Sequence, residues 1–295
     1  MTFLPSDLLC CPLDKRLLRQ DNARLLCANG HSFDIARQGY VNLLGPGDKR
    51  SRDPGDSKEM VSARSAFLNA GHYQPVADRL GALLEQGISG DAIIVDAGCG
   101  EGYYLEQLRR QFSAARLNTP TLLGFDISKW AVQAAARRFA CTWLVASNRN
   151  IPLVPASVDC ILSLFGFPVY ASFHALLKVG GTLLTMNAGP QHLIELREIL
   201  YPSVRYSAST VLEKAQAAGF VAGESSTLHY KTAALNPLHL HQLLTMTPHL
   251  FRASAEGKQR AAQLDRLQIT VDIVFQLLHK PSTFHQERHT DPDSA

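Results

Sequence analysis

An acidic residue and three glycines follow one apolar stretch of the chain at a spacing that suits a binding loop. Residues 92–95 predict a buried strand, Asp96 ends it, and Gly98, Gly100 and Gly102 follow at every second position. Glycine lets the backbone turn sharply and lets a ligand approach without a side chain in between. A helix is then predicted to start near residue 104. Strand, glycine-rich turn and helix in this order form the nucleotide-binding layout of an open α/β sheet.

The glycine spacing differs from that of a loop built for a pyrophosphate. Such loops read G-x-G-x-x-G and aim a helix N-terminus at the phosphates, whereas this chain reads D-x-G-x-G-x-G. The pattern resembles that of class I methyltransferases, whose cofactor S-adenosylmethionine has no phosphate to hold. This resemblance implies that the Asp96 carboxylate and the loop backbone meet the cationic amino-acid end of the cofactor. The alternative is a glycine-rich turn in an unrelated α/β domain.

A second acid strengthens the prediction of a cofactor site. Asp126 ends another apolar run, 24 residues beyond Gly102, which is near the separation expected for a carboxylate that binds ribose hydroxyls. Ile127 follows directly and joins the predicted site. After the next expected strand come Ser147 and Asn148, where either side chain could hydrogen-bond the adenine edge.

Apolar strands and helical patterns alternate regularly from residue 93 onward. This alternation predicts an α/β fold with a largely parallel, Rossmann-like sheet, covered on both faces and binding ligands at the carboxyl ends of its strands. The expected strands are residues 93–96, 121–126, 142–146, 158–164 and 182–186, closed by antiparallel strands in 220–230 and 267–278. The expected helices are residues 59–85 with a break at 71–75, 129–139, one from Pro190, and a cap of 238–246 and 254–264. A turn is expected at residues 178–181.

Cysteines crowd the first 30 residues, and the chain shows no export signal. Without export, disulfides are disfavoured, and this placement favours a metal site. A segment this short cannot be stabilised by its own core alone, so a bound metal would have a structural role. The expected ligands of a tetrahedral zinc ion are Cys11, Asp14, Cys27 and His31, with Cys10 as the alternative to Asp14. An oxygen donor in place of a thiolate should weaken the site. The alternative is a metal-free hairpin with a core of Phe33, Tyr40 and Val41.

The composition is that of an ordinary globular protein. Of 295 residues, 46% are hydrophobic and 19% charged, and the net charge is +3, so any nucleic-acid surface must be a local basic patch. No apolar run approaches the ~20 residues of a membrane helix, and no secretory signal is present, so we expect a cytoplasmic protein that does not bind a membrane. In the loop of residues 45–58, Lys49, Arg50 and Arg52 could grip phosphates or belong to a solvated linker.

Four residues near the predicted cleft have two interpretations each. His72 and Tyr73 stand shortly before the first strand of the sheet and could form a lid on the cofactor or an ordinary helix–helix turn. Phe165 and Phe167 follow the fourth strand and could stack a flipped base. The alternative for these two rings, favoured on sequence alone, is a place in the core.

Taken together, the motifs resemble the bacterial 23S rRNA guanine-N1 methyltransferases of the RlmA or RrmA type. The segments that carry the resemblance are residues 11–14, 27, 30–34, 39–44, 49–56, 70–73, 96–104 and 189–196. The resemblance implies a homodimer that methylates N1 of one guanine in a hairpin of 23S rRNA. It also implies cofactor contacts at Tyr73, Gly100, Glu101 and His192, and it makes the basic loop a candidate for RNA contact. Asp14 departs from the family, which usually has a cysteine there, and this departure concerns the zinc ion alone.

The resemblance divides the chain into four parts. Residues 1–44 are expected to form a zinc-ribbon-like RNA-recognition module, 45–85 a basic linker with helices, 86–280 the methyltransferase domain, and 281–295 a disordered tail. Two other functions compete with rRNA methylation. A small-molecule methyltransferase is disfavoured by the module and the basic loop, and an RNA-binding protein with a degenerate cofactor site is disfavoured by the intact acids and glycines.

In the expected reaction the protein mainly aligns guanine N1 with the methyl carbon, because the sulfonium is already an activated methyl donor. Guanine N1 carries a proton at neutral pH, so a general base or a group that stabilises the developing negative oxygen would help. No catalytic residue is assigned from the sequence. Asp159 sits too early in its strand, and His192 and Glu195 are plausible only by position.

Overall fold

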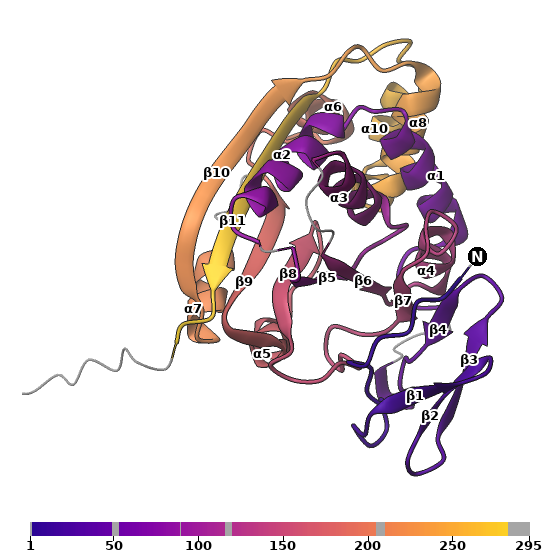
Figure 1. Ribbon diagram of the computed structural model, residues 1–295. Coiled ribbons are helices and arrows are strands. Elements are labelled where there is room, and N and C mark those ends of the chain that lie inside the picture. The colour runs from indigo at the N-terminus through magenta and orange to yellow at the C-terminus, as the bar shows by residue number, and fades with distance from the viewer. Residues whose placement is uncertain (1, 49–52, 89, 116–119, 205–209, 283–295) are drawn as a thin grey trace, which may run out of the picture.

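The structure is a computed structural model that describes residues 2–48, 53–88, 90–115, 120–204 and 210–282. One sheet runs through it, in the strand order β1-β2-β3-β4-β7-β6-β5-β8-β9-β11-β10 (Figure 1). Its centre consists of β5 (Ile93–Ala97), β6 (Thr121–Asp126), β7 (Thr142–Val145), β8 (Val158–Leu164) and β9 (Leu177–Ala188). Adjacent strands in this group are parallel. The predicted α/β fold is therefore confirmed.

Two long strands close one edge of the sheet. β11 (Thr270–His279) pairs antiparallel with β9, and β10 (Val221–Lys231) pairs antiparallel with β11, as predicted. The turn expected at residues 178–181 is wrong, because β9 already begins at Leu177. The backbone groups there are satisfied by strand-like bonds, since Gly180 N–H donates to the Lys280 carbonyl and Lys280 N–H donates to that of Gly181.

The N-terminal strands extend the other edge. β1 (Leu18–Asp21), β2 (Arg24–Cys27), β3 (Ser32–Ala36) and β4 (Tyr40–Asn42) pair antiparallel in succession. β4 then pairs parallel with β7, with Val41 opposite Leu144 and Asn42 opposite Val145. Figure 1 shows these strands at the lower right, continuous with the central sheet.

Neighbouring residues of the central strands enter different hydrophobic cores. Ile94 packs in the first core and Val95 in the second, as expected of strands buried on both faces. The helices that contribute to the first core include α1 (Lys58–Asn69), α2 (Gln74–Glu85), α3 (Tyr103–Ala114), α4 (Lys129–Ala135), α6 (Ile194–Leu200) and α8 (Pro237–Met246). The second core contains side chains of α5 (Tyr170–Leu176), α7 (Val211–Ala217) and the N-terminal strands. In Figure 1, α3 lies above the strands and α5 below them.

The helices agree with the prediction except at some ends. The break expected at residues 71–75 separates α1 from α2, while α4 ends at Ala135 rather than at residue 139. The helix expected from Pro190 is wrong at its start: residues 190–193 form turns, Leu193 takes a φ of +54°, and α6 begins at Ile194. α8 and α10 (Ala255–Ala262) match the expected cap helices, with α9 (His249–Arg252) between them. A short 3₁₀ turn, η1 (Pro46–Asp48), follows β4.

Among the described residues, no helix has both the length and the apolar character that a membrane span requires. The tail expected to be disordered lies almost wholly outside the described residues.

Candidate active site and metal centre

A cavity of about 880 Å³ lies at the carboxyl ends of the central strands. This is where an open α/β sheet binds ligands, since the loops that follow the strands meet there. The predicted cofactor residues that line it are Tyr73, Asp96, Gly98, Gly100, Glu101, Asp126, Ile127, Ser147 and His192. Gly102 completes the predicted set but is not among the lining residues.

The three glycines of the loop have different tasks. All take positive φ angles, +90° at Gly98, +54° at Gly100 and +79° at Gly102. A Cβ at Gly98 would meet nothing within 4 Å, whereas one at Gly102 would come within 2.9 Å of both Ala135 and Trp143. Gly98 therefore leaves space beside the cavity, while Gly102 lets the start of α3 pack closely on α4 and β7.

Asp126 ties two neighbouring strand ends together. Its Oδ2 accepts a hydrogen bond from the Gly100 backbone N–H at 3.0 Å, and its Oδ1 accepts one from the Ser128 N–H at 2.7 Å. Burial raises the pKa of Asp126, and these two backbone donors oppose the rise. The carboxylate is thus fixed in direction and keeps lone pairs for a ligand hydroxyl.

Asp96 has an unpaired acceptor beside the same cavity. Its side chain is buried, and its Oδ1 has no hydrogen-bond partner among the described residues. Burial raises the pKa of this carboxyl well above its usual range, and the charges of Asp126 and Glu101 raise it further. A cationic or hydrogen-donating ligand would relieve this arrangement. S-adenosylmethionine carries both an ammonium and a sulfonium, so the residues present fit that cofactor.

Arginines balance part of this negative charge. Arg64 on α1 forms an ion pair with Asp56, and Arg138 lies 3.7 Å from the Glu101 carboxylate. Arg64 also donates to the Met246 carbonyl at 3.2 Å, which joins α1 to the end of α8. Sequence reasoning missed Arg64 as a site residue. The available signal was its position four residues after Met60, on the apolar face of a predicted helix.

Tyr73 and His192 meet at another wall of the cavity. The Tyr73 hydroxyl lies 3.3 Å from Nε2 of His192, and Nδ1 of His192 accepts a hydrogen bond from the Asp272 backbone N–H at 3.3 Å. Because Nδ1 is an acceptor, the proton of the neutral ring lies on Nε2. Burial lowers the pKa of His192 to about 4. The side chain is therefore a neutral donor at Nε2 and a poor general base.

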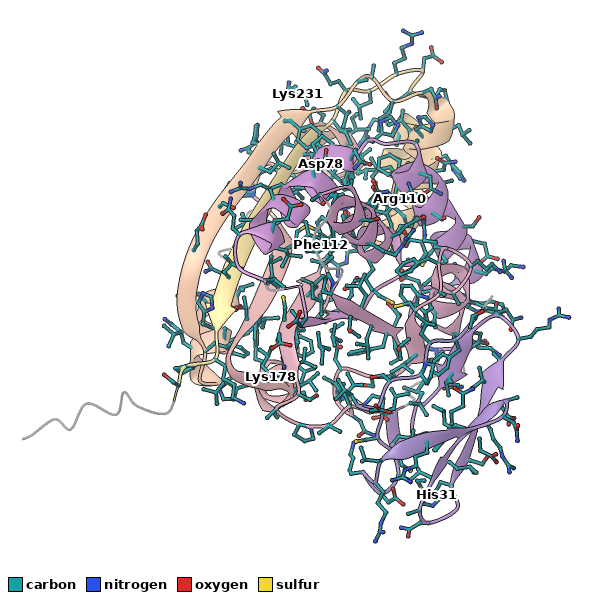
Figure 2. The ribbon with its side chains drawn as sticks, viewed as in Figure 1. His31, Asp78, Arg110, Phe112, Lys178 and Lys231 are labelled. Carbon is teal, nitrogen blue, oxygen red and sulfur yellow. The ribbon has the colours of Figure 1, made fainter. Side chains whose placement is uncertain are left out.

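The other two candidates for a general base are placed elsewhere. Glu195 does not line the cavity, and its carboxylate accepts hydrogen bonds from the backbone N–H and the hydroxyl of Thr270, at 2.8 and 2.6 Å. Asp159 stands near the start of β8, where it pairs with Lys178 at 2.8 Å. Figure 2 labels Lys178 beside α5, below the central strands. Neither carboxylate lines the cavity.

Ser147 and Asn148, which follow β7, line the cavity next to the end of β6, where Asp126 stands. Ser147 Oγ accepts a hydrogen bond from the Arg149 backbone N–H at 3.2 Å. Asn148 donates from Nδ2 to the carbonyl of Phe167 at 3.1 Å, and its buried Oδ1 has no partner among the described residues. An acceptor in this position suits the amino group of an adenine.

His72 and Tyr73, expected to form either a lid on the cofactor or a helix–helix turn, have different surroundings. Tyr73 is buried and lines the cavity, while His72 does not line it and pairs instead with His239 of α8 at 2.9 Å. His72 therefore belongs to a helix–helix contact. The described part of the linker contributes to the cavity as well, because Gly55 and Asp56 line it. The basic residues Lys49, Arg50 and Arg52 lie outside the described residues.

A second cluster of chemical interest lies in the N-terminal strands. The ligand atoms of Cys11, Asp14, Cys27 and His31 all lie within 4.8 Å of one another. Nδ1 of His31 is 3.4 Å from the Cys11 sulfur, 3.3 Å from that of Cys27 and 3.1 Å from Oδ2 of Asp14. Two sulfurs, a nitrogen and an oxygen converging in this way match a tetrahedral zinc site. Figure 2 shows His31 at the outer end of this part of the molecule.

The alternatives for this module are also settled in part. The converging set contains Asp14 and not Cys10, whose backbone pairs with Leu17. Tyr40 and Val41 are buried, as the expected core requires, and Phe33 is half-buried. The three cysteines outside this module are buried; these are Cys99, Cys141 and Cys160.

Known families match both parts of the chain. Residues 9–52 match a zinc-ribbon family model described as "RlmA, N-terminal", and residues 94–181 match one described as "Methyltransferase domain". A methyltransferase of Haloferax volcanii, solved in complex with the activator Trm112, superposes with a TM-score of 0.50 at 18% identity. It covers 79% of this chain and 100% of its own, which supports the fold.

Curated relatives give the family. YxjB of Bacillus subtilis (strain 168), named for guanine-N1 methylation of 23S rRNA, is 32% identical over 89% of this chain and 94% of its own. The 23S rRNA (guanine(748)-N(1))-methyltransferase of Streptomyces fradiae is 36% identical over 64% of this chain and 66% of its own. The chain therefore belongs to the RlmA family of 23S rRNA (guanine-N1)-methyltransferases.

Proposed function

We propose that this protein transfers the methyl group of S-adenosylmethionine to N1 of one guanine in a hairpin of 23S rRNA. The observation that carries the proposal is the buried side chain of Asp96, whose Oδ1 has no partner among the described residues, beside the fixed carboxylate of Asp126. Both stand at the carboxyl ends of two neighbouring parallel strands. A cavity lined by acidic residues at this point of the sheet fits a cationic nucleoside. The names of the relatives supply the RNA and the acceptor atom.

Different lining residues would bind different parts of the cofactor. Asp126 would accept hydrogen bonds from the ribose hydroxyls, and Asp96 with the loop at Gly98 and Gly100 would receive the ammonium end. Ile127 and Ser147 would flank the nucleoside. When bound, the cofactor supplies an activated methyl group on a sulfonium. Glu101, Tyr73 and His192 complete the proposed contacts, with Gly102 supporting the loop from behind.

The protein's part in the reaction is mainly to align the base. The proton on guanine N1 has to leave, and neither His192 nor Glu195, the two candidates closest to this wall by sequence position, is arranged to accept it. Nε2 of His192 is a donor, and Glu195 faces Thr270. The chain therefore contributes position, exclusion of water and hydrogen-bond donors, and no catalytic residue is assigned.

The N-terminal module would grip the RNA. Zinc held by Cys11, Asp14, Cys27 and His31 would stabilise the short strands, and Lys49, Arg50 and Arg52 would contact phosphates. We divide the chain into this module at 1–44, the linker and helices at 45–85, the methyltransferase domain at 86–280 and the tail at 281–295. We also propose a homodimer that works in the cytoplasm.

Two measurements test the proposal. Calorimetry with S-adenosylmethionine should give micromolar or tighter binding, and the absence of binding would leave an RNA-binding protein with a degenerate site. Mass mapping of 23S rRNA from a deletion strain, with and without the gene restored, should show one guanine methylation that depends on the protein. An unchanged pattern together with cofactor binding would point to a small-molecule methyltransferase.

A further inference from the structure

We infer that Phe167 is a stacking platform for a nucleobase of the RNA substrate at the mouth of the cavity. This inference rests on the proposed function, because it commits to RNA as the occupant. Phe167 is 91% exposed, yet it lines the cavity that holds the predicted cofactor site. The expectation that both rings belong to the core is therefore wrong: Phe165 is also exposed, at 40%, and Phe167 packs against little of its own chain.

The loop that presents Phe167 has an unusual backbone. Phe165 takes a φ of +54°, which bulky residues rarely adopt. Its N–H donates to the Met186 carbonyl at 2.8 Å, which fixes the turn directly after β8. Phe165 and Phe167 both line the cavity, with Gly166 between them. Strained backbone concentrates at functional sites, where the surroundings hold it in place.

A side chain from the neighbouring strand end fixes the platform. Asn148, which follows β7, donates from Nδ2 to the Phe167 carbonyl at 3.1 Å. The same amide has its Oδ1 buried without a partner among the described residues, at a wall of the proposed adenine site. Asn148 is therefore a positioning residue: one end of its amide holds the platform and the other is available to the cofactor.

The chemistry of this mouth suits a nucleotide. An exposed aromatic face attracts any base, since every base has a π face to stack. Arg149, also exposed, lies beside Asn148 on the cavity wall and can meet a phosphate. The Phe165 ring, which also lines the cavity, lies 6.1 Å from the His192 ring, centroid to centroid, at an interplanar angle of 30°. A base stacked on Phe167 would thus stand at the entrance to a chamber lined by further rings.

Methyl transfer to unmodified 23S rRNA, with the labelled cofactor, tests the platform. Relative to the wild type, F167A should lower kcat/KM for RNA by roughly 5- to 150-fold, the range that corresponds to the loss of one stacked base. F167L keeps the apolar bulk but lacks the π face and should fall similarly, while F167Y and F167W should retain most of the activity. V179A is the matched control, since Val179 is 59% exposed near the start of β9 and does not line the cavity.

Two further measurements test the inference independently of the kinetics. The Kd of S-adenosylmethionine measured by calorimetry should stay within about twofold of the wild type in F167A, because a lost stack leaves the cofactor site intact. The tryptophan fluorescence of F167W, corrected for Trp130 and Trp143, should be quenched when RNA is added. Wild-type activity in F167A or F167L, or no added quenching in F167W, would overturn the inference.

The same experiments separate this inference from the proposed function. A wild-type enzyme that binds the cofactor but does not methylate 23S rRNA would refute the proposed function. Full methylation by the wild type and by F167A would refute the platform alone. A change in sedimentation of F167A, with RNA kinetics unchanged, would mean that the ring contacts a second copy of the chain, and this too would overturn the inference.

Discussion

Oδ2 of Asp126 lies 3.0 Å from the backbone nitrogen of Gly100, so one hydrogen bond joins the end of β6 to the loop after β5. The residue proposed to bind ribose therefore also holds the loop proposed to receive the other end of the cofactor. Binding at the two ends of the ligand should be coupled through this bond.

Removing that carboxylate should weaken cofactor binding strongly. In D126A, both backbone donors lose their acceptor, and we expect the affinity for S-adenosylmethionine to fall roughly 10- to 100-fold. D126N keeps one acceptor oxygen and should fall between D126A and the wild type. Calorimetry measures the effect, and D91N serves as the control because Asp91 is exposed just before β5. Equal affinities in D126A and the wild type would contradict the proposed role.

The two end glycines of the loop should respond differently to alanine. G102A adds a Cβ within 2.9 Å of Trp143 and Ala135 at a φ of +79°, and we expect a loss of about 2–4 kcal/mol in the free energy of unfolding. G98A adds a Cβ in open space, so only the cost of its positive φ, about 1 kcal/mol, should appear. Cofactor affinity should nevertheless fall in G98A, since its methyl group would narrow the binding loop. Urea denaturation and calorimetry distinguish the two; equal loss of stability would contradict the packing argument.

His192 should make the protein less stable as the pH falls. Burial lowers its pKa to about 4, whereas an unfolded histidine titrates near 6.5. Between these values the unfolded chain binds more protons at this residue, so stability decreases from pH 6.5 downward, by up to about 3 kcal/mol near pH 4. In H192Q this contribution disappears, and the unfolding free energy should fall less steeply between pH 7 and 5. H241Q, at an exposed position of α8, should keep the wild-type slope; equal slopes in H192Q and the wild type would refute the buried neutral ring.

Glu195 should be dispensable for the chemistry. Its carboxylate accepts both donors of Thr270, so E195Q loses part of one contact and about 1 kcal/mol of stability. Methyl transfer should drop by less than about tenfold, whereas loss of a general base costs about 100-fold or more. Steady-state kinetics at a temperature where E195Q is fully folded decide between these outcomes. A loss of the larger size would return Glu195 to the list of catalytic candidates.

The zinc site should be weaker than one with a third thiolate. Asp14 supplies an oxygen where zinc prefers sulfur, so D14C should raise zinc affinity by roughly tenfold or more, and D14A should lower it. Competition of the full-length protein with a chromogenic chelator measures both changes. D34N is the control, because Asp34 is exposed on β3 of the same module and lies outside the cluster. Zinc affinity unchanged in D14A would show that Asp14 is not a ligand.

The sequence predicts those site residues whose position follows from the pattern of their own short segment. Asp96 and Asp126 each end an apolar strand, and parallel pairing brings those ends together. In the same way, Cys11 and His31 stand at turns of one small set of strands. Local pattern and the rules of sheet topology are enough in such cases.

Other parts depend on contacts between distant segments, which leave no periodic trace. Arg64 reaches Met246 across 182 positions of the chain, and neither residue looks functional by itself. Phe167 follows a buried strand, so its type and place favour the core. The left-handed backbone of Phe165, two residues earlier, is not signalled by its residue type.

The pairing of β4 with β7 means that the chain cannot simply be cut at residue 44. Val41 and Asn42 cover the edge of β7 with backbone bonds, so a fragment starting after them would expose unpaired N–H and C=O groups along a buried, apolar strand. Such edges recruit strands from other molecules and lead to aggregation. Expression of the isolated catalytic part should therefore yield insoluble protein, and fragments for crystallography or swapping between relatives should keep the last N-terminal strand attached to the sheet.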